Sequence, residues 1–204
     1  MKLFYAAPSP YSSKVRMAAR HLGLEIEAEH TKTGPENEAL NSANPLGKIP
    51  CLVLDDGSAL FDSRAIMQEF NRLERNKLFP SGKDKRRAAE RIEALADGMC
   101  DAMLLMVYEE RYRPEERRHE DWVEMQWEKV VRSLDWLEQN PARVTNRLHG
   151  GQFALASALG YADFRLPDRN WRRGHPKTKR FLDRFAERFE GWDELKPQAP
   201  PNAA

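Results

Sequence analysis

The sequence of 204 residues contains little cysteine, and its two cysteines are far apart. Cys51 and Cys100 form neither a CxxC pair nor a spacing typical of zinc ligands. Two such thiols build no disulfide framework, which predicts a protein of a reducing compartment. The histidines likewise form no HExxH or other metal-binding pair, so we expect no metal; they are His21, His30, His119, His149 and His175.

An excess of charge of either sign is also missing. The chain has 33 lysines and arginines against 32 aspartates and glutamates, which gives a net charge of +1. Such a balance provides no general attraction for nucleic acid or anionic lipid, so neither is predicted as a partner. The local group of cations over residues 172–180 is interpreted as a solvated face of a helix.

Long apolar runs are absent as well. No stretch approaches the roughly 18 apolar residues that a membrane-spanning helix needs. The apolar segment that follows Met1 and Lys2 is too short for a signal-peptide core, and no small-residue cleavage site comes after it. These absences predict a cytoplasmic protein that does not bind or span a membrane.

The beginning of the chain alternates strand and helix signals. The short apolar run from Leu3 to Ala6 predicts a buried strand. A helix is predicted over residues 10–22, because Ser9 is a good N-cap and Gly23 supplies a stop. Residues 25–29 alternate glutamate with apolar residues, which indicates a strand with one solvated face near a sheet edge.

A hairpin and a further helix are predicted next. Residues 33–44 form a polar stretch in which no helix or strand is predicted. A third strand is expected over residues 49–54, a tight turn at Asp56-Gly57 and a fourth, antiparallel strand over residues 59–61. Helical spacing then continues to Leu73. This order of elements indicates an α/β domain.

The rest of the chain has the pattern of helices alone. From Asp84 onward, charged segments have apolar residues three and four positions apart, and no convincing strand appears. We therefore predict an α/β domain over residues 1–78, a linker over 79–83 and an all-helical domain over 84–196. The proline-rich residues 197–204 are expected to be a flexible tail.

Ser9 stands where the first predicted strand gives way to a helix. Unpaired backbone N–H groups and the helix dipole favour an anion at such a place. A thiolate is such an anion, but Ser9 could instead only cap the helix, and the local sequence by itself favours capping. Cys51 lies in an apolar strand where nothing nearby would lower its pKa, so no role is assigned to it.

Three motifs resemble, in order and spacing, those of the glutathione transferases. Residues 9–16 (SPYSSKVR) resemble the active-site turn of serine- and cysteine-type members, and residues 44–50 (NPLGKIP) resemble their signature loop. Residues 61–66 (FDSRAI) resemble their second glutathione-binding turn, and residues 158–165 are similar, more diffusely, to a bacterial subgroup. The resemblance implies a thioredoxin-like α/β domain followed by an all-α domain, in a bacterial serine-type member similar to the zeta and omega classes.

The resemblance also implies roles for residues of the first domain. Ser9 would be the catalytic residue, donating a hydrogen bond to the glutathione sulfur. The Ile49–Pro50 bond, whose isomer the sequence alone leaves open, would be cis and would turn the backbone groups of Ile49 toward glutathione. Lys48 would bind a carboxylate of the ligand. The alternative interpretation is that Lys48 is a solvated lysine without a role in binding.

Asp62 and Ser63 would bind the γ-glutamyl end of glutathione, because a carboxylate, a hydroxyl and free N–H groups at a helix start suit its charged groups. Their alternative role is simple capping. A site for the second substrate is expected beside the glutathione sulfur. Its predicted residues could equally belong to the core, and they are Tyr11, Met103, Met106, Tyr108 and Tyr112.

One departure from the family pattern concerns the start of the helix near Gln152. Relatives place Ser or Thr three residues before Asp or Gln, which forms a capping box. Here His149 takes that place and two glycines follow it. We expect half of the box to be missing, and a less stable second domain rather than a different fold.

The implied reaction is attack of the bound glutathione thiolate on a small hydrophobic electrophile, which the sequence does not identify. Glutathione would be the co-substrate, no metal would take part, and the protein would be a homodimer. Two other functions stay open. One is a non-catalytic glutathione-binding or protein-interaction protein with the same fold. The other, a glutathione-dependent thiol reductase, is less favoured because that chemistry usually needs a cysteine in place of Ser9.

Overall fold

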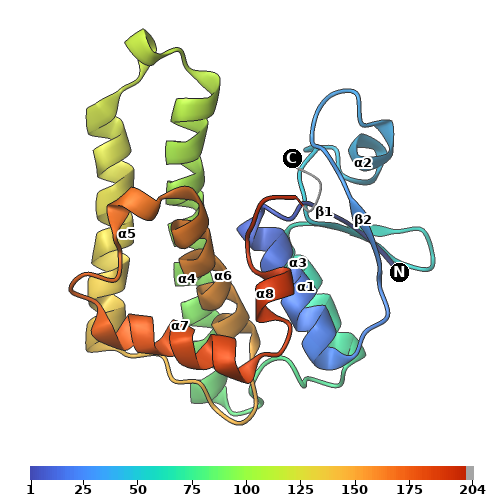
Figure 1. Cartoon of the computed structure of the whole chain (residues 1–204). Helices are drawn as coiled ribbons and strands as arrows, with labels where there is room; N and C mark the ends of the chain where they lie inside the picture. Colours follow the sequence, from blue (N-terminus) through green and yellow to red (C-terminus); the bar gives the residue numbers. More distant parts are fainter. Residues whose placement is uncertain (201–204) are drawn as a thin grey trace.

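The first half of the chain is built on a four-stranded sheet, in a computed structural model that describes residues 1–200 (Figure 1). The strands lie in the order β2, β1, β3, β4, and their bounds are β1 (Lys2–Tyr5), β2 (Glu27–His30), β3 (Cys51–Val53) and β4 (Ala59–Leu60). β1 and β2 are parallel, and the other two pairs are antiparallel. The predicted edge position of the second strand and the predicted hairpin are therefore confirmed.

Helices cover both faces of the sheet. They are α1 (Pro10–Leu22), α2 (Glu38–Ala43) and α3 (Ser63–Leu73). Successive residues of the central strands point to opposite faces. Leu3 and Leu52 belong to the large core shared with α1 and α3, whereas Phe4 and Cys51 pack with Leu40 of α2 in a smaller cluster. This arrangement is the thioredoxin-like α/β layer that the family resemblance implied.

The first helix begins and ends where its sequence signals predicted. Ser9 is the N-cap of α1, and Gly23 ends the helix in the left-handed conformation, at φ 70°. The sequence missed α2, which lies inside the polar stretch. This helix has six residues, and only Leu40 among them is buried, so it leaves no apolar period to detect. Asn37 caps it by accepting a hydrogen bond from the backbone N–H of Leu40 at 2.9 Å.

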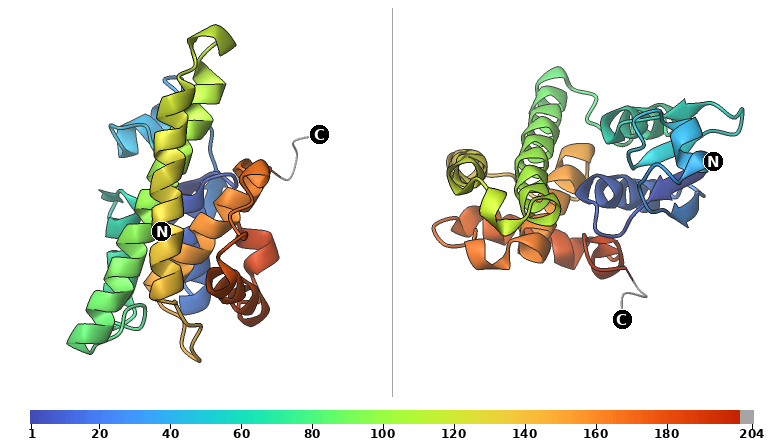
Figure 2. Two further views of the ribbon diagram at one scale, coloured as in Figure 1. Left: turned by 90° about the vertical axis from the view of Figure 1, so that its left-hand side faces the viewer. Right: turned by 90° about the horizontal axis from the view of Figure 1, so that it is seen from above.

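The second half is helical, as predicted. Its elements are α4 (Lys83–Tyr112), η1 (Glu115–Arg117), α5 (Glu120–Gln139), α6 (Gly150–Arg165), η2 (Pro167–Arg169), α7 (Pro176–Arg188) and α8 (Trp192–Leu195). The antiparallel pair of α4 and α5 projects beyond the rest of the molecule (Figure 2). Every residue of α6 from Gly150 to Ala162 is buried, so this helix forms the centre of the domain. None of the described helices could cross a membrane.

Helices α4 and α6 approach each other closely at Gly151. A Cβ atom at this position would lie 2.3 Å from the carbonyl oxygen of Ala89, which is backbone and cannot turn aside. The same turn contains one half of the capping box, since Oε1 of Gln152 accepts a hydrogen bond from the backbone N–H of His149 at 2.8 Å. The buried Nδ1 atom of His149 has no hydrogen-bond partner.

A buried group of charges joins the two halves. Nζ of Lys14, on α1, lies 2.9 Å from both carboxylate oxygens of Asp97 and 3.3 Å from Oε1 of Glu93, both on α4. These three residues are at most 5% exposed. Nε of Arg64, on α3, lies 2.8 Å from Asp97. Burial raises the pKa of Glu93, and the charge of Lys14 opposes the rise. We call these four residues the interdomain ion cluster.

The end of the described chain also returns to the first domain. The hydroxyl of Ser13, on α1, donates a hydrogen bond to the carbonyl oxygen of Leu195 at 2.6 Å. The backbone N–H of Gln198 donates to the carbonyl oxygen of Ala7 at 3.2 Å, and Pro197 is buried. The beginning of the predicted tail is therefore held against the first domain. The last four residues of the tail, 201–204, lie outside the described part of the chain.

We expect Gly151→Ala to lower the free energy of unfolding by about 1–3 kcal/mol, because the added methyl group forces α4 and α6 apart. Gly98→Ala is the matched control: it is also a helical glycine, but a Cβ atom there meets nothing within 4 Å. That substitution should stabilise the protein by about 0.5–1 kcal/mol. Urea unfolding measures both. Equal shifts in the two variants would show that the close contact is unimportant.

We expect Lys14→Met to cost about 3–5 kcal/mol of stability, because it leaves buried carboxylates without their ammonium partner. Lys2→Met is the control, since Lys2 forms an ion pair with Glu29 in which both side chains are more than one-third exposed. Its loss should cost less than about 1 kcal/mol. Urea unfolding at neutral pH compares the variants, and a small loss in both would rule out a stabilising role for the interdomain ion cluster.

Candidate functional site

The directions of the strands bring three turns to one edge of the sheet, the edge formed by the C-terminal ends of β1 and β4 and the N-terminal end of β3. β1 and β3 are antiparallel and pair Phe4 with Cys51, so the chain leaves β1 at the edge where it enters β3. β4 runs antiparallel to β3 and therefore ends at this same edge. The turns that contain Ser9, Pro50 and Ser63 gather there as a result. These are the three segments that carry the predicted glutathione site.

Ser9 is placed for both of the roles that its sequence position left open. Its backbone is extended, at φ −81° and ψ 122°, and its Oγ accepts a hydrogen bond from the backbone N–H of Ser12 at 3.2 Å. Pro10 follows as the first residue of the helix. A hydroxyl oxygen that accepts one hydrogen bond still has its own hydrogen to donate. Capping and anion binding are therefore compatible at Ser9, which is partly exposed.

The neighbouring serines are occupied inside the protein. Ser12 has no exposed surface, and its Oγ accepts a hydrogen bond from the backbone N–H of Ala6 at 3.4 Å. Ser13 is 2% exposed and its hydroxyl donates to Leu195. Among the three serines of this turn, Ser9 alone is accessible from the edge of the sheet.

One buried amide shapes the loop that enters β3. The side chain of Asn44, which is 1% exposed, donates to the carbonyl oxygen of Lys48 at 2.8 Å and accepts from the backbone N–H of Leu46 at 3.0 Å. Gly47 has φ 59°, a conformation that favours glycine. The Ile49–Pro50 bond that follows is cis, as the family resemblance implied. The side chain of Lys48 is exposed.

The turn before α3 presents a carboxylate and a hydroxyl at a helix start. Asp62 is the N-cap, and its Oδ1 accepts a hydrogen bond from the backbone N–H of Arg64 at 3.0 Å. Ser63 is 2% exposed, and the Phe61–Asp62 bond is cis. The next residue, Arg64, belongs to the interdomain ion cluster, which thus fixes the start of α3 as well as α1.

The residues predicted for the second substrate are divided between core and surface. Met103 is fully buried in the main core, and Met106 is 5% exposed. Tyr108 and Tyr112 are 39% and 68% exposed, with their ring centroids 5.1 Å apart in an edge-to-face arrangement. Tyr11 is partly buried, and its hydroxyl donates to Asp101 of α4. Accessible aromatic surface is therefore concentrated near the end of α4.

The interdomain ion cluster was not predicted from the sequence, although signals for it exist. Lys14 lies four residues before Ala18 on the predicted apolar stripe of α1, where a cation is out of place without a partner. Glu93 and Asp97 lie four residues apart and therefore on one face of α4. Both observations predict buried charge, but only the structure shows that the charges meet.

The cysteines are not activated in this structure. Both are free and buried. Burial raises the pKa of Cys100 well above its ordinary value and also raises that of Cys51. Thiols in such surroundings stay protonated at neutral pH and are poor nucleophiles. Within residues 1–200 no three His, Cys, Asp or Glu side chains are grouped as metal ligands would be.

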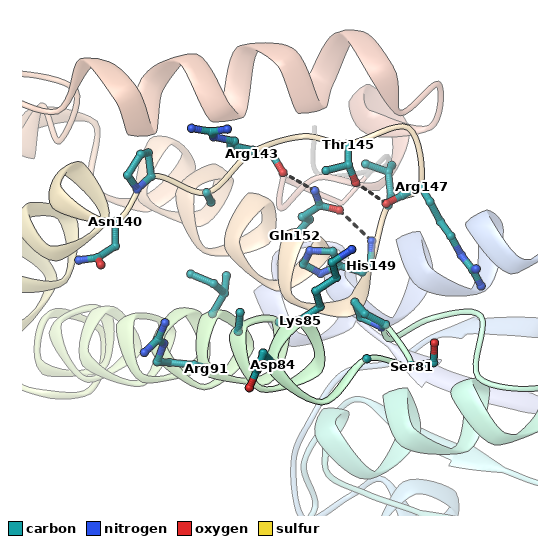
Figure 3. Close-up of a pocket in the computed structure, with 18 of the residues that line it drawn as sticks. Ser81, Asp84, Lys85, Arg91, Asn140, Arg143, Thr145, Arg147, His149 and Gln152 are labelled. Atoms are coloured by element: carbon teal, nitrogen blue, oxygen red, sulfur yellow. Dashed lines mark hydrogen bonds between the residues drawn. The ribbon is translucent and has the colours of Figure 1, made fainter.

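A large open groove lies elsewhere, between the first turns of α4 and the segment that joins α5 to α6 (Figure 3). Its volume is about 1430 Å³, and its lining includes several exposed cations, among them Lys85, Arg91 and Arg143. His149 also lines it, and burial lowers the pKa of this histidine to about 4. No predicted site residue borders the groove, so we do not assign the chemistry to it.

Comparisons with known proteins agree with the fold and with the motifs. A family model described as the glutathione S-transferase N-terminal domain matches residues 8–73, and one described as the C-terminal domain matches residues 120–184. An Escherichia coli (strain K12) protein described as the uncharacterized GST-like protein YibF is 30% identical, with 100% of both chains covered.

Two solved structures extend the likeness to the whole fold. A glutathione transferase family member from Pseudomonas fluorescens Pf-5, with bound glutathione, is 34% identical, has a TM-score of 0.90, and covers 97% of this chain and 99% of its own. A glutathione S-transferase from Methylobacterium radiotolerans JCM 2831, in complex with glutathione sulfonate, is 32% identical, with a TM-score of 0.88 and coverage of 98% and 95%. The chain therefore belongs to the glutathione S-transferase family.

Proposed function

We propose that this protein is a glutathione transferase whose bound glutathione thiolate attacks a small hydrophobic electrophile. The observation that carries the proposal is the position of Ser9. Its hydroxyl caps a helix, keeps a hydrogen to donate and is accessible at the edge where the turns of Pro50 and Ser63 also gather. Relatives from Pseudomonas fluorescens and Methylobacterium radiotolerans hold glutathione and glutathione sulfonate.

Glutathione would lie along this edge with its sulfur near Ser9. The backbone of Ile49, before the cis bond to Pro50, would pair with the cysteinyl part of the tripeptide as an added strand does. Lys48, which is exposed, would meet a carboxylate of the ligand. The start of α3, with Asp62 and Ser63, would bind the α-amino and α-carboxylate groups of the γ-glutamyl end.

The chemistry needs only modest stabilisation of the thiolate. A thiol pKa of roughly 8.5 falls by about two units if the thiolate gains about 2.7 kcal/mol. A hydrogen bond to a charged group supplies roughly 1.5–3 kcal/mol and a helix N-terminus about 0.3–1 kcal/mol. The proton goes to water, the sulfur forms a bond to carbon, and the leaving group, such as chloride from an aryl chloride, departs with its electron pair.

The electrophile would bind where α4 passes the start of α1. Tyr108 and Tyr112 provide exposed rings, Tyr11 is partly buried, and Met106 is largely covered. Met103 would support this wall from the core. The reaction and the two free cysteines suit the reducing cytoplasm, which is the location we propose.

The second candidate function is glutathione binding without catalysis. The same fold and the same edge of the sheet would serve it, because a family fixes a scaffold more closely than an activity. Retention on immobilised glutathione together with turnover of a generic aryl halide supports the transferase. Retention without turnover of any member of a broad panel of electrophiles supports the binding protein.

A homodimer is the assembly that we propose. Its support in this chain is apolar side chains left in solvent, such as Leu46 at 65% and Leu105 at 42% exposed. We expect sedimentation equilibrium at micromolar concentration, without ligand, to give twice the mass of one chain. Leu46→Glu should shift the protein toward the monomer. A monomeric unmodified protein in this experiment contradicts the proposal.

Substitution of Ser9 tests the reaction itself. We expect Ser9→Ala to raise the pKa of bound glutathione and to lower turnover roughly 10- to 100-fold, equal to about 1.4–2.7 kcal/mol, with little change in glutathione affinity. Ultraviolet titration of the bound thiolate measures the pKa. Ser9→Gly is the control for helix capping, since glycine caps nearly as well as serine but donates no side-chain hydrogen bond.

Both Ser9 variants should lose turnover equally if the hydroxyl acts on the sulfur. If Ser9→Gly retains full turnover, the residue acts only as a cap. A rise in thiolate pKa that occurs in Ser12→Ala and in neither Ser9 variant assigns the role to Ser12 instead.

A further inference from the structure

The groove between the first turns of α4 and the segment that joins α5 to α6 has an excess of positive charge (Figure 3). Six lysines and arginines line it, against one carboxylate, that of Asp84. The cations are Lys77, Lys83, Lys85, Arg91, Arg143 and Arg147. Because the whole chain has a net charge of only +1, this excess is local. A concave surface lined by one sign of charge raises the local concentration of ligands of the opposite sign.

Most of these cations have no carboxylate partner. Four of the six are exposed and form no ion pair among residues 1–200, and they are Lys83, Lys85, Arg91 and Arg143. The guanidinium of Arg91 lies over the ring of Trp136 instead, 5.2 Å from its centre. The carboxylate of Asp84 is 3.4 Å from Arg87, which does not line the groove. The described chain therefore leaves most of this positive charge without a counter-charge.

Hydrogen bonds fix the wall of the groove that lies opposite α4. Nε2 of Gln152, which is 1% exposed, donates to the carbonyl oxygen of Arg143 at 2.7 Å. The guanidinium of Arg147 donates to the carbonyl oxygen of Lys77 at 2.9 Å, and the hydroxyl of Thr145 donates to the carbonyl oxygen of Arg147 at 2.6 Å. The backbone that carries Arg143 is thus held in place before a ligand arrives, which lowers the entropic cost of binding.

The cations are too far apart for a single small anion. Lys85 and Arg91 both lie on α4, where a separation of six residues corresponds to roughly 9 Å along the helix axis. Arg143 lies on the opposite wall (Figure 3). A ligand that contacts all three therefore needs several anionic groups along its length. The volume of about 1430 Å³ leaves room for such a molecule, and the partly buried side chains of Ile92 and Trp136 add an apolar part to the lining.

We propose that this groove binds a small molecule with a chain of phosphate groups, such as a nucleoside triphosphate or inorganic triphosphate. A phosphate chain carries negative charge on every group, which matches cations that are spread along and across the groove. The guanidinium of an arginine binds two phosphate oxygens at once, and a lysine acts as a point charge beside them. None of the residues assigned to glutathione or to the electrophile lines the groove, so this inference is independent of the proposed function.

Calorimetry at about 0.15 M salt tests the proposal with three probes, which are inorganic triphosphate, ATP and adenosine. We expect both phosphate chains to bind and adenosine not to bind. The double variant Lys85→Gln/Arg143→Gln should bind triphosphate about tenfold more weakly, because it removes one cation from each wall. Arg180→Gln/Arg184→Gln is the matched control: it also removes two exposed cations, but from α7 and outside the groove, and it should bind triphosphate as the unmodified protein does.

Several results would overturn the proposal. They are the absence of triphosphate binding at this salt concentration, equal affinities of the two double variants, adenosine binding as tight as that of ATP, and tighter binding of tetraglutamate or of a single-stranded oligonucleotide than of triphosphate. Binding by the Leu46→Glu monomer alone shows that a second copy of the chain covers the groove, and it also overturns the proposal. Unchanged thermal unfolding of Lys85→Gln/Arg143→Gln without ligand shows that this variant is folded. A failure to bind glutathione contradicts the proposed function and leaves this inference standing.

Discussion

The contact on which the site most depends is that between Asp97 and the two cations that reach it. Lys14 comes from the helix that Ser9 caps, and Arg64 comes from the helix that Asp62 caps. Both helices therefore take their position from one carboxylate of the other domain. Glu93 supplies the second negative charge, so the interdomain ion cluster holds two cations and two acids. The hydroxyl of Ser9 and the N–H groups at the start of α3 are therefore held in fixed positions relative to each other, although they lie more than fifty residues apart in sequence.

The elements that carry strong local signals were predictable. An N-cap serine followed by proline, a left-handed glycine at φ 70° and a tight turn between short strands each indicate structure without help from the rest of the chain. Six-residue α2 has no apolar period, so it was missed. The three turns of the site could be found by resemblance alone. Their meeting at one edge depends on strand pairing, which links residues far apart in sequence.

Buried charges were the features that could not be predicted from the sequence. A lysine on an apolar stripe indicates a partner but does not name it, and Asp97 is 83 residues away from Lys14. The partner of a buried charge is therefore a property of the tertiary structure here, while the family is a property of the sequence.

The contacts of Ser13 with Leu195 and of Ala7 with Gln198 have a consequence for biosynthesis. The ribosome releases the first domain long before it adds the residues that complete the surroundings of α1. During that interval Lys14 lacks Asp97 as a partner, and the hydroxyl of Ser13 lacks the carbonyl oxygen of Leu195 as a hydrogen-bond acceptor. The contacts that complete the surroundings of α1 can therefore form only after the residues up to Gln198 have left the ribosome, so the first domain emerges before its first helix has these partners.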